Sequence, residues 1–270
     1  VPLDARGVTL EHLLRHTAGL ATDFDSGEVD FESPDEVASA MLVRTPRTPA
    51  GAHYRYDNRN YTLAAIVIER AGGGDLRELL TREVFGPAGL TSTYCSQDED
   101  PNLQGKCATG YQRGGDAGLA LATPYHYGFR GATGIVTTAA DLAAWTRALW
   151  SGPLLDDLSR SAMFRPGRAG YGLGWFIDPV PPARRDDLGP IRVHHDGSTA
   201  GFDASVAFWP RASGGHASVV ALSNDRFWLP TIADEIEALV TAADEPARRA
   251  VLPAAADARP EDLAALSGVY

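Results

Sequence analysis

The side chains that could do chemistry in this sequence are few and far apart. His12 and His16 are four residues apart, which would put both rings on one face of a helix, where they could share a metal ion. Leu13 follows His12 where a zinc protease would have a glutamate, and no third ligand is evident. We therefore expect no metal site, and we interpret both histidines as residues that pack or cap near a helix end.

Several familiar catalytic and cofactor motifs are absent. No serine lies in a G-x-S-x-G turn, and no G-x-G-x-x-G follows a predicted strand. Lys106 is the single lysine, and it does not belong to a phosphate-binding loop. The sequence therefore supports neither an α/β-hydrolase nucleophile elbow nor a binding site for a dinucleotide or a nucleoside triphosphate. We expect no cofactor.

The two cysteines, Cys95 and Cys107, are separated by a polar stretch that contains a proline and a glycine. So short a loop could bring the two sulfurs together, and a local disulfide is one expectation. Two unrelated thiols are the alternative. A bridge would indicate an oxidising compartment.

Composition limits the class of partner and the location. The net charge is −11, whereas binding to nucleic acid needs a clustered basic face, so no nucleic-acid partner is expected. The longest apolar run, residues 63–68, ends at Glu69 and Arg70 and is far shorter than the ~18 residues of a membrane span. The first four residues do not resemble a signal peptide. The protein is therefore expected to be cytoplasmic, or its leader is absent from this sequence.

Helical signals dominate the first half of the chain. Ser33 and Glu36 form a capping box with Pro34 at the first helical position, and glycines end the third and fourth predicted helices. Thr138 and Asp141 indicate a further cap. The periodicity predicts helices over residues 9–16, 34–44, 60–71, 75–85 and 138–150.

The second half carries strand signals. Short apolar runs separated by Gly, Pro and Asp predict strands over residues 171–177, 191–195, 204–209 and 217–223, followed by an amphipathic helix over residues 230–243. Helices followed by an antiparallel meander and a closing helix predict an α+β fold. We expect one domain over residues 1–245, with a helical part at about 9–165 and a sheet part at about 170–243. An Ala-, Pro- and Arg-rich linker is expected over residues 246–260.

Four segments form a recognisable series of motifs. Residues 8–20 fit T-x-x-x-L-L-x-H-T-S-G-L, with Ala18 where serine is usual, and residues 49–61 contain Y-x-N as Tyr56 and Asn58. Residues 131–142 fit G-x-x-G-l-x-s-T-a-x-D-l-a, and residues 194–202 fit g-H-x-G-x-x-x-G-f. This series resembles the serine β-lactamase and penicillin-binding-protein family, the group of class C β-lactamases, DD-peptidases and esterases, with His195 where β-lactamases proper have the lysine of K-T-G.

This resemblance implies a β-lactamase/transpeptidase-like fold and a role for each matched residue. Tyr56 would take part in proton transfer beside a serine nucleophile, which requires a nearby positive charge to lower its pKa from about 10. Asn58 would hydrogen-bond the substrate and help to hold a lysine base. His195 would lie across the cleft and donate to Tyr56 or to a substrate carboxylate. Gly197 would let substrate approach the strand closely, and the backbone N–H of Ser198 would be one oxyanion donor.

One family motif has no counterpart in this sequence. The nucleophile of the family lies in S-x-x-K, but the single lysine, Lys106, has Leu103 three residues before it. We therefore expect an N-terminally truncated hydrolase domain that lacks the strands and the helix that carry the nucleophile, and that is inactive as it stands. Residues 261–270 are similar to the start of the small β-domain that follows such hydrolases.

The substrates implied are a β-lactam, a D-alanyl peptide, or a small ester or amide, and His195 in place of lysine favours an esterase or peptidase. The longer protein would be periplasmic or extracellular, with a cytoplasmic location as the alternative. The competing hypothesis is a non-catalytic protein that binds a ligand or partner in a degenerate cleft. The sequence does not indicate an oligomeric state.

Overall fold

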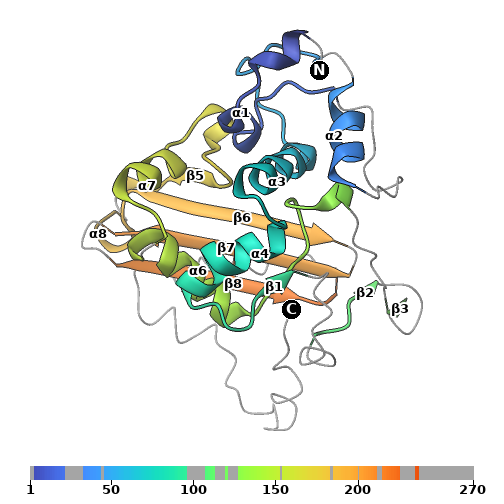
Figure 1. Cartoon of the computed structure of the whole chain (residues 1–270). Coiled ribbons are helices and arrows are strands. Elements are labelled where there is room, and N and C mark those ends of the chain that lie inside the picture. The colour runs from blue at the N-terminus through green and yellow to red at the C-terminus, as the bar shows by residue number, and fades with distance from the viewer. Residues whose placement is uncertain are drawn as a thin grey trace.

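The computed structural model places a group of helices beside a four-stranded antiparallel sheet (Figure 1). It describes residues 3–21, 33–43, 46–95, 107–112, 119–120, 127–152, 154–182, 185–199, 201–211, 215–225 and 235–236. In Figure 1 the sheet crosses the middle of the molecule, α6 and α7 lie in front of it, and α1, α2 and α3 gather beyond its β6 side.

The helices begin where side chains cap them. Ser33 accepts a hydrogen bond from Glu36 N–H at the start of α2, Asp57 accepts one from Arg59 N–H at the start of α3, and Thr138 caps α6. Gly73 ends α3 in the left-handed conformation. The α-helices are α1 (Leu10–Leu14), α2 (Pro34–Leu42), α3 (Asn58–Gly72), α4 (Leu76–Leu80), α5 (Gly86–Ala88), α6 (Ala139–Ser151), α7 (Asp157–Met163) and α8 (Arg185–Leu188).

Tighter or wider turns complete the helical segments: 3₁₀ turns at η1 (Leu3–Gly7), η3 (Tyr127–Phe129) and η4 (Arg168–Gly170), and a π turn at η2 (Thr81–Phe85). The single helix predicted over residues 75–85 is thus α4 continued by η2.

The sheet is formed by β5 (Phe176–Pro179), β6 (Ile191–Thr199), β7 (Phe202–Pro210) and β8 (His216–Ser223), in that order. Each pair is antiparallel, and His195 of β6 lies opposite Val206 of β7. Two short ladders lie outside it: β1 (Tyr94–Cys95) pairs with β4 (Ile135–Val136), and β2 (Tyr111–Gln112) pairs with β3 (Leu119–Ala120). The expected α+β arrangement is confirmed.

Apolar side chains pack on both faces of the sheet because neighbours along a strand point to opposite sides. In β7, Phe208 packs with Leu149 of α6 and Phe164, whereas Trp209 packs on the other face with Leu188 of α8. A separate cluster joins α1, α2 and α3 through residues that include Leu13, Val37, Met41, Leu63 and Ile66. The helical part and the sheet part therefore have distinct cores.

Of the two alternatives for the cysteines, a local disulfide and separate thiols, the structure shows the second: it holds Cys95 and Cys107 as thiols. Cys95 is buried and packs with Phe85 and Leu90, whereas the hydroxyl of its neighbour Tyr94 contacts the sulfur of Cys107.

Some predicted elements differ from the observed ones or lie beyond them. The strand predicted over residues 171–177 begins only at Phe176, because Gly174 takes a positive φ and residues 172–175 turn back on themselves. Of the predicted helix at residues 230–243, only 235–236 are described, and they are helical. The linker and the β-domain start lie outside the described residues. No helix in the described ranges is long and apolar enough to cross a membrane.

We predict that Phe208→Ala lowers the free energy of unfolding by about 3–5 kcal/mol, because Phe208 is fully buried between α6 and the sheet. Leu158→Ala is the matched control, since Leu158 is 83% exposed, and it should change that free energy by less than about 0.5 kcal/mol. Urea unfolding measures both. Equal effects of the two substitutions would contradict the packing of β7.

Candidate active site

Tyr56 lies directly before α3, where Asp57 caps the helix. Its side chain is 45% exposed, and its ring centroid lies 4.3 Å from that of His16, 6.0 Å from that of His195 and 6.3 Å from that of Tyr171. The sheet part contributes His195, and the helical part contributes His16. The structure therefore brings Tyr56 and His195 together from the two parts of the chain.

His195 is held on β6 by hydrogen bonds to both ring nitrogens. Its Nδ1 lies 2.7 Å from the carbonyl oxygen of Asp196, which can only accept, so Nδ1 carries the proton. Burial lowers the pKa of His195, so the ring is neutral at neutral pH and its Nε2 accepts from the Tyr171 hydroxyl at 3.1 Å. This differs from the sequence-based expectation, in which His195 donates to Tyr56 or to a substrate: in that neutral form it has no proton to donate from Nε2.

The other three predicted site residues are Asn58, Gly197 and Ser198. All three are exposed, and each lies within three positions of Tyr56 or His195 in the sequence. Asn58 is the first residue of α3, and no hydrogen bond of the described residues ties its side chain to Tyr56 or His195. Gly197 and Ser198 follow His195 on β6, and β5 pairs with β6 only at residues 191–194. Among the described strands, the edge beside Gly197 and Ser198 is open. A Cβ on Gly197 would meet only Ala204, at 4.0 Å, so the fold itself does not require glycine there.

His16 lies beneath this site, 1% exposed, and was interpreted from sequence as a structural residue. Its ring lies against four tyrosines, with centroid distances of 6.2 Å to Tyr54, 4.3 Å to Tyr56, 5.2 Å to Tyr61 and 4.9 Å to Tyr171. Burial lowers the pKa of His16 to about 4, against a smaller opposing effect of the Asp57 carboxylate. His16 is therefore neutral at neutral pH.

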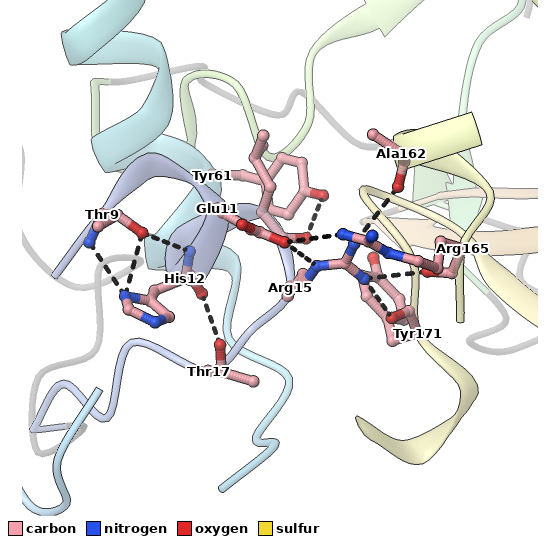
Figure 2. A network of polar contacts seen from close by, with 10 residues as sticks. Thr9, Glu11, His12, Arg15, Thr17, Tyr61, Ala162, Arg165 and Tyr171 are labelled. Atoms are coloured by element: carbon pink, nitrogen blue, oxygen red, sulfur yellow. Dashed lines mark hydrogen bonds and ion pairs between the residues drawn. The ribbon is translucent and has the colours of Figure 1, made fainter. Parts of the chain in front are cut away.

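Tyr171, which positions His195, is itself anchored to α1 by Arg15. The Arg15 guanidinium donates to the carbonyl oxygens of Ala162, Arg165 and Tyr171, at 3.3, 3.0 and 3.4 Å, and its Nε donates to Glu11 (Figure 2). The same view shows the Tyr61 hydroxyl, which donates to the carbonyl of Leu14 at 2.9 Å. The contacts of Arg15 tie the helical part to the segment that leads into β5, whereas that of Tyr61 joins α3 to α1.

His12 has a local role at the start of α1. Its Nδ1 accepts from Thr9 N–H while the Thr9 hydroxyl accepts from His12 N–H, which is a capping arrangement (Figure 2). No group of His, Cys, Asp and Glu side chains in the described ranges could hold a metal ion. His12 thus caps, and His16 packs among tyrosines.

The electrostatics of the site determine what Tyr56 can do. Burial raises the pKa of the Tyr56 phenol, and no cation among the described residues counteracts this shift. The phenol therefore keeps its proton at neutral pH, so it can donate a proton or a hydrogen bond but cannot act as a base. A base for acyl transfer has to come from elsewhere.

Sequence reasoning missed the roles of His16 and Tyr171. His16 lies in the quoted motif at residues 8–20, and Tyr171 begins a Tyr-Gly-Leu-Gly-Trp run that was interpreted as strand. The available signal was the motif context of His16. For Tyr171, 24 residues before His195, no pattern within the chain indicated the hydrogen bond.

Comparison with known proteins places these residues in a family context. Residues 2–243 match the family model described as Beta-lactamase. The chain is 27% identical over 176 residues to the "Putative penicillin-binding protein PbpX" of Bacillus subtilis, covering 64% of this chain and 43% of that protein. It is 33% identical over 150 residues to a "D-aminopeptidase" of Brucella anthropi, covering 52% of this chain and 28% of that protein. The chain thus spans less than half the length of these relatives.

Solved structures resemble the fold. A penicillin-binding protein from Bacillus halodurans superposes with a TM-score of 0.71 at 23% identity, covering 88% of this chain and 74% of that one. A "Beta-Lactamase/D-Alanine Carboxypeptidase" from Pseudomonas syringae superposes with a TM-score of 0.71 at 21% identity, covering 88% and 72%. At this level of identity the likeness concerns the fold alone.

The low pKa of His16 predicts a stability loss in mild acid. The unfolded chain protonates His16 near its ordinary pKa of 6.5, whereas the folded chain resists protonation until about pH 4. Stability that is complete above about pH 6.5 should therefore fall as the pH drops towards 4, by about 3 kcal/mol for this group. Urea unfolding at several pH values measures the effect.

His16→Asn should remove this contribution. The free energy of unfolding of the variant should therefore change less between about pH 7 and 4.5 than that of the unmodified protein. His53→Asn is the control, because His53 is exposed. If His16→Asn leaves the pH dependence unchanged, His16 is not buried in its neutral form.

Proposed function

The chain belongs to the Beta-lactamase family, and on that premise we propose that it provides the tyrosine, asparagine and histidine side of the acyl-transfer site of a serine hydrolase. The family and the β-lactamase/transpeptidase-like fold expected from the motifs are confirmed. The observation that carries the proposal is the approach of Tyr56 and His195, whose ring centroids are 6.0 Å apart although they come from different parts of the fold.

Each residue has one task in this proposal. Tyr56 donates its phenol proton to the leaving group as the acyl bond breaks and regains a proton from the lysine that we place with the nucleophile, whose positive charge offsets the rise in the Tyr56 pKa caused by burial. His195, with its tautomer set by Tyr171 and Asp196, orients the substrate beside Tyr56. Asn58 hydrogen-bonds the acyl side of the substrate from the first turn of α3. Ser198 N–H, beside Gly197 on the open edge of β6, is one oxyanion donor.

The nucleophile is a serine outside this sequence. The motif residues of the chain include no S-x-x-K, and Tyr56 lacks the cation that would make it a base. We place the serine and its lysine in a segment of a longer protein, in keeping with the 43% and 48% shares of two penicillin-binding-protein relatives that the chain covers. By itself the 270-residue chain should form no acyl-enzyme.

Small acyl or peptide substrates are those of the family, and this chain fits an ester or a D-amino-acid peptide better than a dedicated β-lactamase. His195 stands in the place of the K-T-G lysine, and a neutral histidine supplies no fixed positive charge for a β-lactam carboxylate. The similarity to a protein described as a D-aminopeptidase supports the same class. An exported location is part of this proposal and rests only on the penicillin-binding-protein relatives.

We predict that the 270-residue chain takes up no label from a fluorescent penicillin or a fluorophosphonate, because nothing in it replaces an activated serine. The natural protein, extended until it includes an S-x-x-K, should be labelled at that serine. Mass spectrometry locates the modified residue. Stoichiometric labelling of any serine of the short chain, or a natural coding sequence without S-x-x-K, would contradict the proposal.

In the extended protein, Tyr56→Phe should slow acylation by about a hundredfold or more, because it removes the proton donor for the leaving group while keeping the ring. Tyr111→Phe is the matched control, since Tyr111 is also partly exposed, at 37%, and lies outside the site on β2. Stopped-flow measurement of acylation compares the two. Equal acylation rates for both variants would remove Tyr56 from the chemistry.

A further inference from the structure

We propose that His16 is a positioning residue that fixes Tyr56 through its carbonyl oxygen, its ring Nδ1 and the face of its ring. The inference rests on the proposed function, because it assigns a purpose to holding Tyr56 in one place. His16 does not reach the substrate, since it is 1% exposed and lies beneath the Tyr56 ring.

Two hydrogen bonds to His16 flank Tyr56 along the chain. The N–H of Arg55 donates to the His16 carbonyl oxygen at 2.8 Å, and the N–H of Asp57 donates to His16 Nδ1 at 3.2 Å. The residue before Tyr56 and the residue after it are thus both bonded to one anchor. Rotation of the Tyr56 backbone would break at least one of these bonds.

The ring of His16 completes the contact. Its centroid lies 4.3 Å from that of Tyr56, with the two planes tilted by 41°, so the buried imidazole supports the more exposed phenol from below. Asn60, buried on α3, donates from Nδ2 to the same Nδ1 at 3.2 Å. The ring therefore also ties Tyr56 to the first turn of α3.

The identity of the residue follows from these bonds. Asp57 N–H can only donate, so Nδ1 of His16 must be unprotonated and the proton is on Nε2. That Nε2 has no hydrogen-bond partner among the described residues, although it is buried. A leucine at position 16 would not bury an N–H group without a hydrogen-bond partner. The presence of histidine there, despite this cost, indicates that the acceptor at Nδ1 is needed.

The backbone of His16 is held in an unfavourable conformation. Its φ is +53°, and among the described residues only Ala169 shares a positive φ without being glycine. Such strain persists where surrounding contacts over-determine the conformation, and here it turns both the carbonyl and the ring towards residues 55–57. Asparagine is the best substitute, because it tolerates this region and carries an acceptor near the position of Nδ1.

The test uses 3-fluorotyrosine incorporated at position 56 of the full chain, with ¹⁹F NMR and amide hydrogen exchange of Asp57. His16→Phe keeps an aromatic ring and removes the acceptor, so the Tyr56 resonance should move towards that of the free amino acid and Asp57 exchange should accelerate by about tenfold or more. His16→Asn should preserve the slow exchange of Asp57. Should His16→Phe fail to fold, His16→Leu tests the same loss at smaller volume.

Leu13→Ala separates positioning from general damage to the core. Leu13 is buried in the cluster of α1, α2 and α3, so its truncation lowers stability without touching Tyr56. The fluorine resonance and the Asp57 exchange should then stay as in the unmodified chain. An unchanged Tyr56 signal in His16→Phe, or the same disturbance in Leu13→Ala, would overturn the proposal.

These readouts need no catalysis, so they stand apart from the proposed function. If they behave as expected and the extended protein still fails to acylate, the function is wrong and the positioning is right. If it acylates, His16→Phe should lower kcat by about tenfold with KM little changed, and should have no further effect in a Tyr56→Phe background. Full additivity of the two substitutions would show that His16 does not act through Tyr56.

Discussion

Hydrogen bonding between the segment after α1 and the segment before α3 determines where the site can form. The N–H groups of Arg47, Gly51 and Arg55 donate to the carbonyls of Gly19, Thr17 and His16, each at 2.8 Å. Gly19 takes a φ of +70°, and a side chain there would overlap the carbonyl oxygen of Thr48. This close pairing brings the residues before α3 over His16, and Tyr56 is thereby placed above a buried ring.

A second set of contacts sets this helical part against the sheet. Arg15 donates to three carbonyls on the segment from α7 towards β5, which include that of Tyr171. Tyr171 in turn donates to His195 on β6. Because the two parts have separate apolar cores, these polar and aromatic contacts, rather than one continuous core, bring Tyr56 and His195 together. Contacts of this kind are directional, which suits a site that needs fixed geometry.

Local patterns predicted much of the fold. Caps at Ser33 and Thr138, together with the helical periodicity, matched α2 and α6, and the alternating apolar runs matched β6, β7 and β8. The spacing of Cys95 and Cys107 left a disulfide and two separate thiols open, and only the structure, which holds thiols, distinguishes them. Motif order placed Tyr56 and His195 as candidates, but their chemistry depends on burial, which raises one pKa and lowers the other. The hydrogen bonds of His16 and Tyr171 join residues 41 and 24 positions apart, respectively, beyond any local pattern.

The arrangement of these rings can be measured directly. A two-dimensional NOE spectrum of the folded chain, with histidine and tyrosine ring protons assigned, should show cross-peaks from Tyr56 to both His16 and His195, since their ring centroids lie 4.3 and 6.0 Å apart. Cross-peaks to both rings would establish that the helical part and the sheet part meet at Tyr56. Their absence, with Tyr56 contacting neither histidine, would contradict the central claim that one site is built across the two parts.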